Sequence, residues 1–157
     1  MTHLRYLRYL LRHKWYVFVE CCRAGMPWRG LIHDWHKFLP DEWLAYAEHF
    51  YALQRANDES GYIKADDQGD RGYDAAWLRH IHRGPHHWNH WIMFDGGEVK
   101  VLEMPPRYRR EMLCDWRGAG RAQGFGDNTP EWYTRNKDKM LLGPKTRAWV
   151  ELEIGQR

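Results

Sequence analysis

Apolar side chains recur along this chain at intervals of three and four residues, the spacing that places them on one face of an α-helix. No segment alternates apolar and polar residues for long, as a half-buried strand would. The pattern predicts helices over residues 3–24, 28–37, 40–54, 74–83, 106–116, 129–142 and 145–154. We therefore expect an all-α fold in which residues 1–157 form one compact bundle of about six to seven helices.

Glycine and proline mark the ends of several predicted helices. Gly25 is a natural stop for the first helix, and Gly84-Pro85 interrupts the helical pattern after residue 83. A segment from His86 ends at Gly96-Gly97, and residues 98–103 could form a short strand or an extended linker. Two further stretches are expected to be loops: residues 56–73, which are acidic and polar and predict a mobile surface loop, and residues 117–126, which hold four glycines.

The composition is that of a globular protein, with 43% hydrophobic and 29% charged residues. A net charge of +3 gives no electrostatic reason to expect a duplex DNA partner. Cys21, Cys22 and Cys114 form no CxxC pair, so we expect reduced, buried small side chains and neither a disulfide framework nor a zinc knuckle. No stretch resembles a signal peptide or a membrane span, which predicts a cytoplasmic protein with no membrane partner.

Histidine is the feature of the composition that points to chemistry. The chain holds ten histidines, more than packing requires, and histidine is the commonest metal ligand. Helical bundles build metal sites from side chains on several helices, and imidazole with carboxylate suits transition metals. The candidate ligands, on the predicted helices and on the segment from His86, are His13, His33, Asp34, His80, His82, His86, His87, His90 and Asp115. They predict one or two divalent transition metal ions, of Mn, Fe, Zn, Ni or Co.

The order of these residues resembles the HD superfamily of metal-dependent phosphohydrolases, especially its two-metal branch. The string His33-Asp34-Trp35-His36-Lys37 is similar to the HDxGK segment of cyclic-dinucleotide phosphodiesterases, with His36 where that branch has glycine and with no GYP tripeptide. The strings HDWHKF, HHW and EMLCDW also resemble a small, largely uncharacterised, mostly phage-encoded HD-like family over nearly the whole chain.

The resemblance implies a set of metal ligands. These are His13, His33, Asp34, His80, one or both of His86 and His87, and Asp115, with Asp34 as the bridging carboxylate if two ions bind. The choice between His80 and His82 stays open at this point. Because Gly84-Pro85 interrupts the helix between His80 and His87, the two segments can turn back toward each other.

The catalytic residues implied are Asp34, His36 and Lys37. Lys37 follows His33 by four residues on the same predicted helical face, where its ammonium could meet a substrate phosphate together with Arg117 and Arg121. His36 or His90 could shuttle a proton to the leaving group. Trp35, Trp88 or Trp91 could stack on a nucleobase.

The function implied is hydrolysis of a nucleotide or a small phosphodiester by metal-activated water. One alternative is a di-iron oxygenase of the HD type, which uses the same order of ligands. Another is a non-catalytic protein, of phage type, that binds a host partner through its Arg-rich first helix. A phage-encoded protein would act in the cytoplasm of the host cell.

Overall fold

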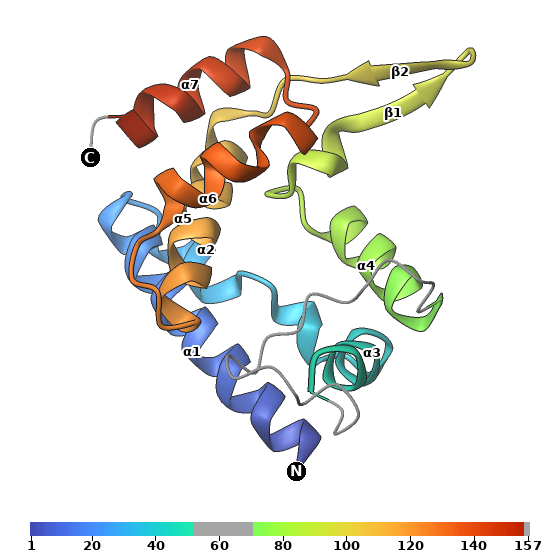
Figure 1. Cartoon of the computed structure of the whole chain (residues 1–157), viewed down its shortest axis with the longest axis vertical. Coiled ribbons are helices and arrows are strands. Elements are labelled where there is room, and N and C mark those ends of the chain that lie inside the picture. Colours follow the sequence, from blue (N-terminus) through green and yellow to red (C-terminus); the bar gives the residue numbers. More distant parts are fainter. Residues whose placement is uncertain (52–70, 156–157) are drawn as a thin grey trace.

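A computed structural model describes residues 1–51 and 71–155 of the chain (Figure 1). Its seven described α-helices are α1 (Thr2–Arg23), α2 (Pro27–Ile32), α3 (Pro40–Tyr51), α4 (Arg71–Arg83), α5 (Pro106–Ala122), α6 (Thr129–Asn136) and α7 (Pro144–Gly155). Between them lie the 3-10 turns η1 (Trp35–Phe38), η3 (Trp88–Trp91) and η4 (Lys137–Lys139), and the strands β1 (Ile92–Asp95) and β2 (Glu98–Val101). The expected all-α fold is confirmed.

The long helix α1 buries a stripe that sequence periodicity alone does not single out. The buried positions are Tyr6, Leu10, His13, Val17, Glu20 and Cys21. Leu4 and Leu11 follow the apolar spacing of this helix, yet each is more than half exposed. Apolar residues occur on both faces of α1, so their spacing does not decide which face is buried. A histidine therefore lies within the buried stripe, between Leu10 and Val17.

Helix α5 packs along α1 more extensively than any other helix does. The two backbones approach closely because Gly118 has no side chain: a Cβ there would lie 2.5 Å from Val17 Cγ2 and 2.8 Å from Val17 N. Residues 117–126 were expected to form a loop, but α5 continues to Ala122. The prediction was wrong because Gly118 serves helix packing rather than a turn.

Two main apolar clusters lie on either side of this crossing. One gathers Tyr6, Leu10, Tyr46, Ala47 and Ala76 from α1, α3 and α4. The other gathers Met104, Met112, Tyr133, Met140, Leu142 and Val150, with α5, α6 and α7 as its helices. Val17, Cys21 and Cys114 form a small third cluster where α1 meets α5. All three cysteines are free, as expected. Cys21 and Cys114 are buried as predicted, whereas Cys22, also predicted to be buried, is exposed.

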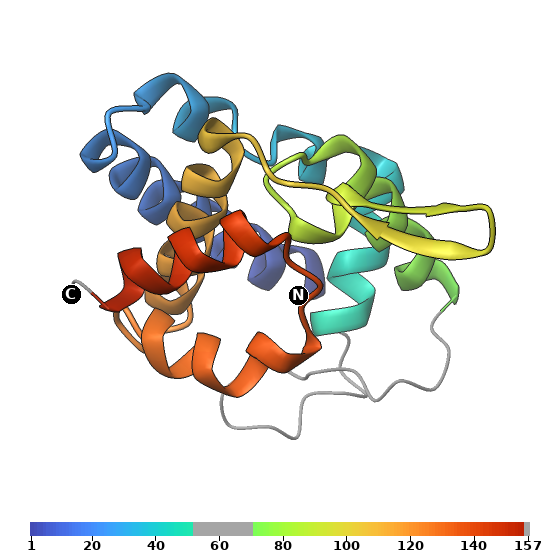
Figure 2. The ribbon, with the colours of Figure 1, turned by 90° about the horizontal axis from the view of Figure 1, so that it is seen from above.

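Strands β1 and β2 form an antiparallel hairpin that projects from the helices (Figure 2). Gly96 and Gly97 form its turn, with φ values of 61° and 83°. This left-handed pair matches the turn that two-residue hairpin loops prefer. The expected short strand at residues 98–103 is thus confirmed in part, as Glu98–Val101.

The loop expected at residues 56–73 lies mostly outside the described residues. Its last three residues belong to α4, which begins at Arg71. Asp74, the first residue of the predicted helix, lies in the first turn of α4, where a carboxylate interacts favourably with the helix dipole. Among the described residues, no helix has the length and apolar character needed to cross a membrane.

Candidate metal centre

The chain breaks its helix at the His-Asp pair. Residues 28–37 were expected to form one helix, but α2 ends at Ile32 and η1 begins only at Trp35. His33 is extended, with ψ of 128°, and Asp34 is left-handed, with φ of 50° and ψ of 29°. Aspartate tolerates this conformation better than most residues. The break leaves both side chains buried, at 1% and 3% exposure.

One group of candidate ligands joins α1, the break and α5. Nε2 of His13 lies 3.2 Å from Oδ1 of Asp115, and Nε2 of His33 lies 3.4 Å from the same oxygen. These three ligand atoms lie within 4.8 Å of one another. They converge because the Val17–Gly118 contact, one helical turn away on each helix, fixes how α1 crosses α5.

A second group joins the break with α4 and the segment that follows it. Nε2 of His80 lies 2.7 Å from Nε2 of His87, and Nε2 of His86 lies 3.3 Å from Oδ1 of Asp34. Gly84 makes the return possible, because a Cβ there would lie 2.9 Å from the ring of His87. The predicted convergence across Gly84-Pro85 is confirmed. The structure brings both His86 and His87 into this group.

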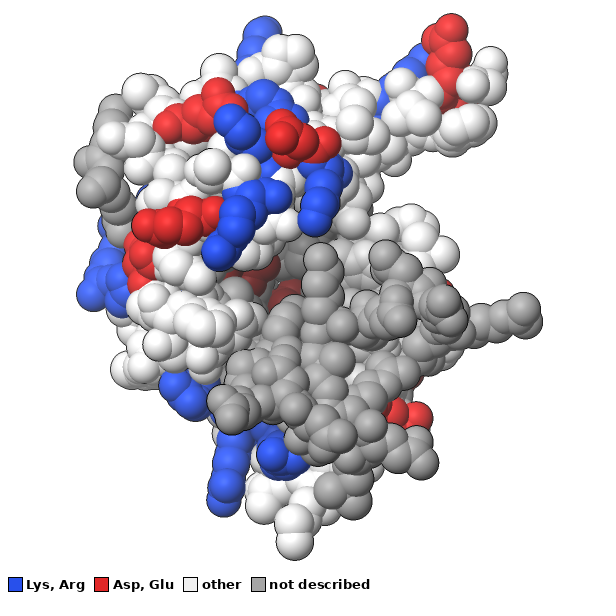
Figure 3. Space-filling view, viewed as in Figure 1, with Lys and Arg blue, Asp and Glu red and all other residues white. Residues whose placement is uncertain are grey.

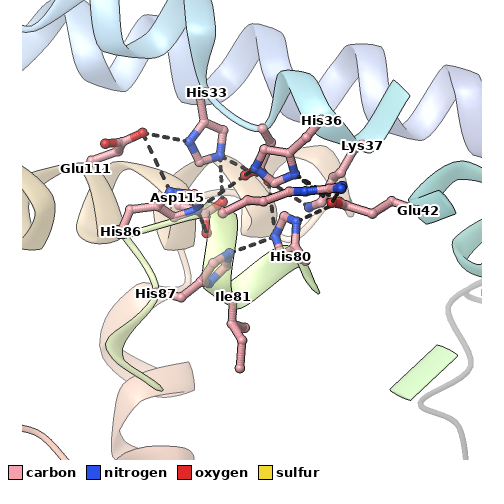
Figure 4. A network of polar contacts seen from close by, with 12 residues as sticks. His33, His36, Lys37, Glu42, His80, Ile81, His86, His87, Glu111 and Asp115 are labelled. Carbon is pink, nitrogen blue, oxygen red and sulfur yellow. Dashed lines mark hydrogen bonds and ion pairs between the residues drawn. The ribbon is translucent and has the colours of Figure 1, made fainter. Parts of the chain in front are cut away.

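Asp34 faces both groups at once. Its Oδ2 lies 3.5 Å from Nε2 of His33 and 3.7 Å from Nε2 of His80, while its Oδ1 lies toward His86. A carboxylate with this placement is suited to bridge two cations held by the two groups. The structure thus brings together all seven residues predicted as ligands (Figure 4).

Two glutamates that were not predicted as site residues contact the Nδ1 atoms of the histidines, one at each end of the network in Figure 4. Oε1 of Glu111 lies 3.2 Å from Nδ1 of His33. Oε2 of Glu42 lies 2.9 Å from Nδ1 of His36 and 3.0 Å from Nδ1 of His80. A carboxylate only accepts hydrogen bonds, so each of these Nδ1 atoms carries a proton, and Nε2 is the ring nitrogen left to bind a metal.

Each glutamate is in turn paired with an arginine. Nε of Arg29 lies 2.5 Å from Glu111, and Nη1 of Arg83 lies 2.7 Å from Glu42. In the sequence, Glu42 stands out only weakly, as an acidic residue that follows Pro40 in the first turn of a helix. Acidic residues stabilise this part of a helix in any case, so the position does not by itself indicate a role at the centre. Glu111 lies among the basic and apolar residues of α5, and nothing in its spacing distinguishes it.

Burial and charge set the protonation of the centre. Burial lowers the pKa of His13, His80 and His87, and lowers the pKa of His86 to about 4. Burial acts in the same direction on His33, but Asp34 and the other carboxylates outweigh it and raise its pKa to about 10. The carboxylates collected here therefore attract positive charge, whether carried by protons or by metal ions.

Several buried atoms of the centre make no hydrogen bond of acceptable geometry with a described residue. These are Nε2 of His13, His33 and His86 and Oδ1 of Asp34, although His13 and His33 lie within ion-pair distance of Asp115. Buried polar atoms are rarely left this way, because an unsatisfied group costs about 1–3 kcal/mol. Imidazole nitrogens and carboxylate oxygens facing a common centre are the donor set that divalent transition metals prefer. The residues present therefore fit a metal ion.

Lys37 and His36 also face Asp34. Nζ of Lys37 lies 2.8 Å from Oδ2 of Asp34, so the lysine pairs with this carboxylate. The helical face that Lys37 was expected to share with His33 is absent, because no helix spans both residues. Burial lowers the pKa of Lys37, but Asp34 outweighs it and holds the pKa well above its usual value. His36 is buried, with Nε2 3.9 Å from Oδ1 of Asp34.

Other predicted residues lie elsewhere. Arg117 lies 3.8 Å from Asp127 and Arg121 lies 3.1 Å from Glu20, and neither lines the cavity beside the centre. On α5, Arg117 is two residues from Asp115 and so points to another side of the helix. His82 is exposed, which leaves His80 as the histidine of α4 at the centre.

The remaining candidates are a histidine and three tryptophans. Nδ1 of His90 lies 2.8 Å from the carbonyl oxygen of Ile81, outside both groups. Of the tryptophans expected to stack on a base, only Trp88 lines the cavity. Trp35 is 58% exposed, and Trp91 packs against the C-terminal apolar cluster.

A cavity of about 360 Å³ opens beside the centre. His13, Lys37, His87 and Asp115 line one part of it, and the rest is lined mainly by side chains from α1, α4, η3, α5, α6 and η4. Figure 3 shows a hollow in this face of the molecule, with acidic side chains deep within it and Lys and Arg side chains gathered above it. A small molecule in the cavity would therefore reach the candidate ligands.

The comparisons with known proteins identify a family and no activity. The model of a family described as "Family of unknown function (DUF5662)" matches residues 2–156. No curated protein and no solved structure matches the chain.

Proposed function

The chain belongs to the family of unknown function DUF5662, and we propose that it is a metal-dependent phosphohydrolase. Its substrate is a nucleotide or a small phosphodiester. The observation that carries the proposal is the position of Asp34, whose two carboxylate oxygens face two groups of imidazoles and carboxylates at once. The open cavity beside this arrangement supports a catalytic role rather than a structural one.

The two groups divide the ligands between two metal ions. His13, His33 and Asp115 would hold one ion, and His80, His86 and His87 would hold the other together with Asp34, which lies between the two groups. A pair of divalent transition metal ions would lower the pKa of a water molecule toward neutrality and neutralise charge on a phosphate. The donor set suits Mn, Fe, Zn, Ni and Co alike, so the proposal names the class of metal and not one element.

Lys37 binds and orients the phosphate. Its ammonium lies at the edge of the cavity and 2.8 Å from Asp34, so a phosphate that approaches the centre meets this charge. His36 is 5% exposed and does not line the cavity, and Glu42 holds its Nδ1. We therefore assign His36 to orienting the centre rather than to carrying a proton to the leaving group.

The first experiment measures metal in the purified protein by mass spectrometry. We expect about two equivalents of transition metal in the wild type. His80→Ala should lose metal, while His82→Ala, a matched change at an exposed position of the same helix, should keep it. A protein that takes up no metal after incubation with Mn, Fe, Ni and Zn would contradict the proposal.

The second experiment measures hydrolysis by the metal-loaded protein, with and without oxygen. Nucleoside monophosphates, cyclic nucleotides and an aryl phosphodiester are the substrates to compare. We expect release of phosphate or of the alcohol at the same rate in both atmospheres, and no activity in Asp34→Asn. Turnover that consumes oxygen and cleaves no phosphate ester would overturn the assignment in favour of an oxygenase.

A further inference from the structure

The cavity extends from the candidate metal centre along one side of α5. Asp115, Trp116, Ala119, Gly120 and Gln123 all line it, and their spacing follows one face of the helix. Gln123 lies eight residues beyond Asp115, which is about 12 Å along the helix axis. The cavity thus has a near end at the centre and a far end about two helical turns away.

Four of the residues that line the cavity are tryptophans. Trp77, Trp88, Trp116 and Trp132 line the cavity and are half-buried. The rings of Trp116 and Trp132 lie 5.1 Å apart at an angle of 51°. Walls of this kind favour a flat, aromatic part of a ligand, because stacking on an indole is available to every π-system.

The far end holds side-chain amides that have no hydrogen-bond partner among the described residues. Gln123 and Asn128 line the cavity, and neither side chain makes a hydrogen bond with a described residue. Asn128 reaches this position because residue 120 is glycine: a Cβ there would lie 2.3 Å from its Oδ1. An amide presents a donor and an acceptor side by side, which is the pattern at the edges of nucleobases.

We propose that the far end of the cavity is a nucleobase subsite and that the substrate is a nucleotide with a single base. The base lies among the tryptophans with its edge toward Gln123 and Asn128, and the phosphate lies toward Lys37. The direction of the phosphate rests on the proposed function, whereas the base subsite rests on the cavity alone. A volume of about 360 Å³ is at the small end for ligand pockets, which favours one base over two.

Calorimetry with purified protein tests the subsite. The ligands are a nucleoside monophosphate for each common base, the matching nucleosides and ribose 5-phosphate. We expect at least one nucleotide to bind about tenfold or more tightly than ribose 5-phosphate, because hydrogen bonds to the amides and stacking on an indole ring both favour the base. Gln123→Met should reduce that ratio about tenfold, since it removes the amide at similar volume.

Two further arms separate this inference from the proposed function. Trp132→Leu should weaken the binding of nucleosides and of nucleotides to the same extent. Trp28→Leu, at a 69% exposed position on α2, should leave both affinities unchanged. Nucleosides should also bind the chelator-treated protein, where no metal assists. If no nucleotide binds better than ribose 5-phosphate, the base subsite is overturned even if the protein hydrolyses phosphate esters. If nucleosides bind but no ester is cleaved, the subsite stands and the phosphohydrolase proposal fails.

Discussion

At the scale of single residues, Asp34 combines a strained backbone with a central position. It is the one non-glycine residue with positive φ in the described part of the chain. A left-handed conformation costs an ordinary residue about 1–2 kcal/mol. Such strain is found where the surrounding structure enforces it, often at functional sites. Here it turns the carboxylate toward both groups of candidate ligands.

Replacing Asp34 by Gly and by Ala should separate the backbone from the side chain. Both variants lose the same carboxylate and leave Lys37 without its ion pair, so their difference reports the conformation alone. We expect Asp34→Gly to be more stable than Asp34→Ala by about 1 kcal/mol. Urea unfolding in the presence of a chelator measures this. Equal stabilities would mean that the left-handed conformation is not enforced in the folded protein.

The glutamates behind the histidines should control metal affinity. Glu111→Gln keeps the size of the side chain and removes the negative charge that faces the Nδ1 proton of His33. We expect metal to bind about 10- to 100-fold more weakly, the usual effect of losing such a partner. Competition with a chromogenic chelator gives the affinity. Glu48→Gln, an exposed glutamate of α3, is the control and should leave the affinity unchanged.

The sequence predicted the residues that meet at the centre better than it predicted their supports. All seven predicted ligands converge because histidines on buried faces have a chemical signature of their own. Glu42 and Glu111 were not predicted, because charged residues are common at exposed positions along the whole chain and only the packing shows which of them are buried. Arg117 and Arg121 were misplaced because the loop expected there is helix, which turns them away from the cavity.

At the scale of elements, the crossing of α1 and α5 sets the first group of ligands. The contact of Gly118 with the backbone of Val17 lies one turn from His13 and Asp115.

Gly118→Ala should force the helices apart, lowering the free energy of unfolding by about 1–3 kcal/mol and weakening metal binding with it. Thermal unfolding and metal titration of the same variant test both. Gly155→Ala is the control, because a Cβ there meets nothing within 4 Å. Unchanged metal affinity in a destabilised Gly118→Ala would separate packing from the centre.

Helix α7 begins against a carboxylate from a distant part of the chain. Glu103 accepts hydrogen bonds from the backbone N–H groups of Lys145 and Thr146. Burial raises the pKa of Glu103, but these hydrogen bonds outweigh it and lower the pKa below its usual value. A lowered pKa means that the folded state binds this proton less readily than the unfolded state. The stabilisation is therefore present above about pH 4.5 and lost as pH falls further.

Glu103→Gln should consequently be less stable than the wild type at neutral pH, and the difference should shrink in acid. Chemical unfolding of both proteins at pH 7 and pH 4 gives the comparison. A difference that is independent of pH would show that the charge of Glu103 does not stabilise α7.

The helices were largely predictable and their interruptions were not. Prolines and capping residues marked the starts of α3, α5 and α6, and Gly25 ended α1 with a φ of 74°. The break at His33 and Asp34 contains neither glycine nor proline, so local sequence gave no sign of it. The hairpin was only half predicted, although Gly96-Gly97 is the turn that such hairpins prefer.

At the scale of the whole molecule, the centre joins two apolar clusters. Its candidate ligands come from α1, the break, α4, the segment after α4, and α5. They therefore connect the apolar cluster of α1, α3 and α4 to α5, which contributes Met112 to the other apolar cluster. A metal that binds the folded chain and not the unfolded chain stabilises it by about 2.7 kcal/mol at a hundredfold excess over its Kd.

Removal of metal should therefore lower the melting temperature of the protein. We expect a shift of about 5–10 °C at such an excess, reversed when Mn or Zn is added back. Differential scanning fluorimetry with and without a chelator measures it. Asp34→Asn should melt at one temperature under both conditions, and a wild type that also ignores the chelator would contradict a metal at the centre.

Most of the chain lies between His13 and Asp115, whose side chains meet 3.2 Å apart. Such a contact forms late in folding, because the entropy of closing a long loop must first be overcome. A cation that needs this contact can therefore do little to speed folding and acts mainly by slowing unfolding. The availability of metal would therefore change how long the folded protein persists more than how fast the protein folds.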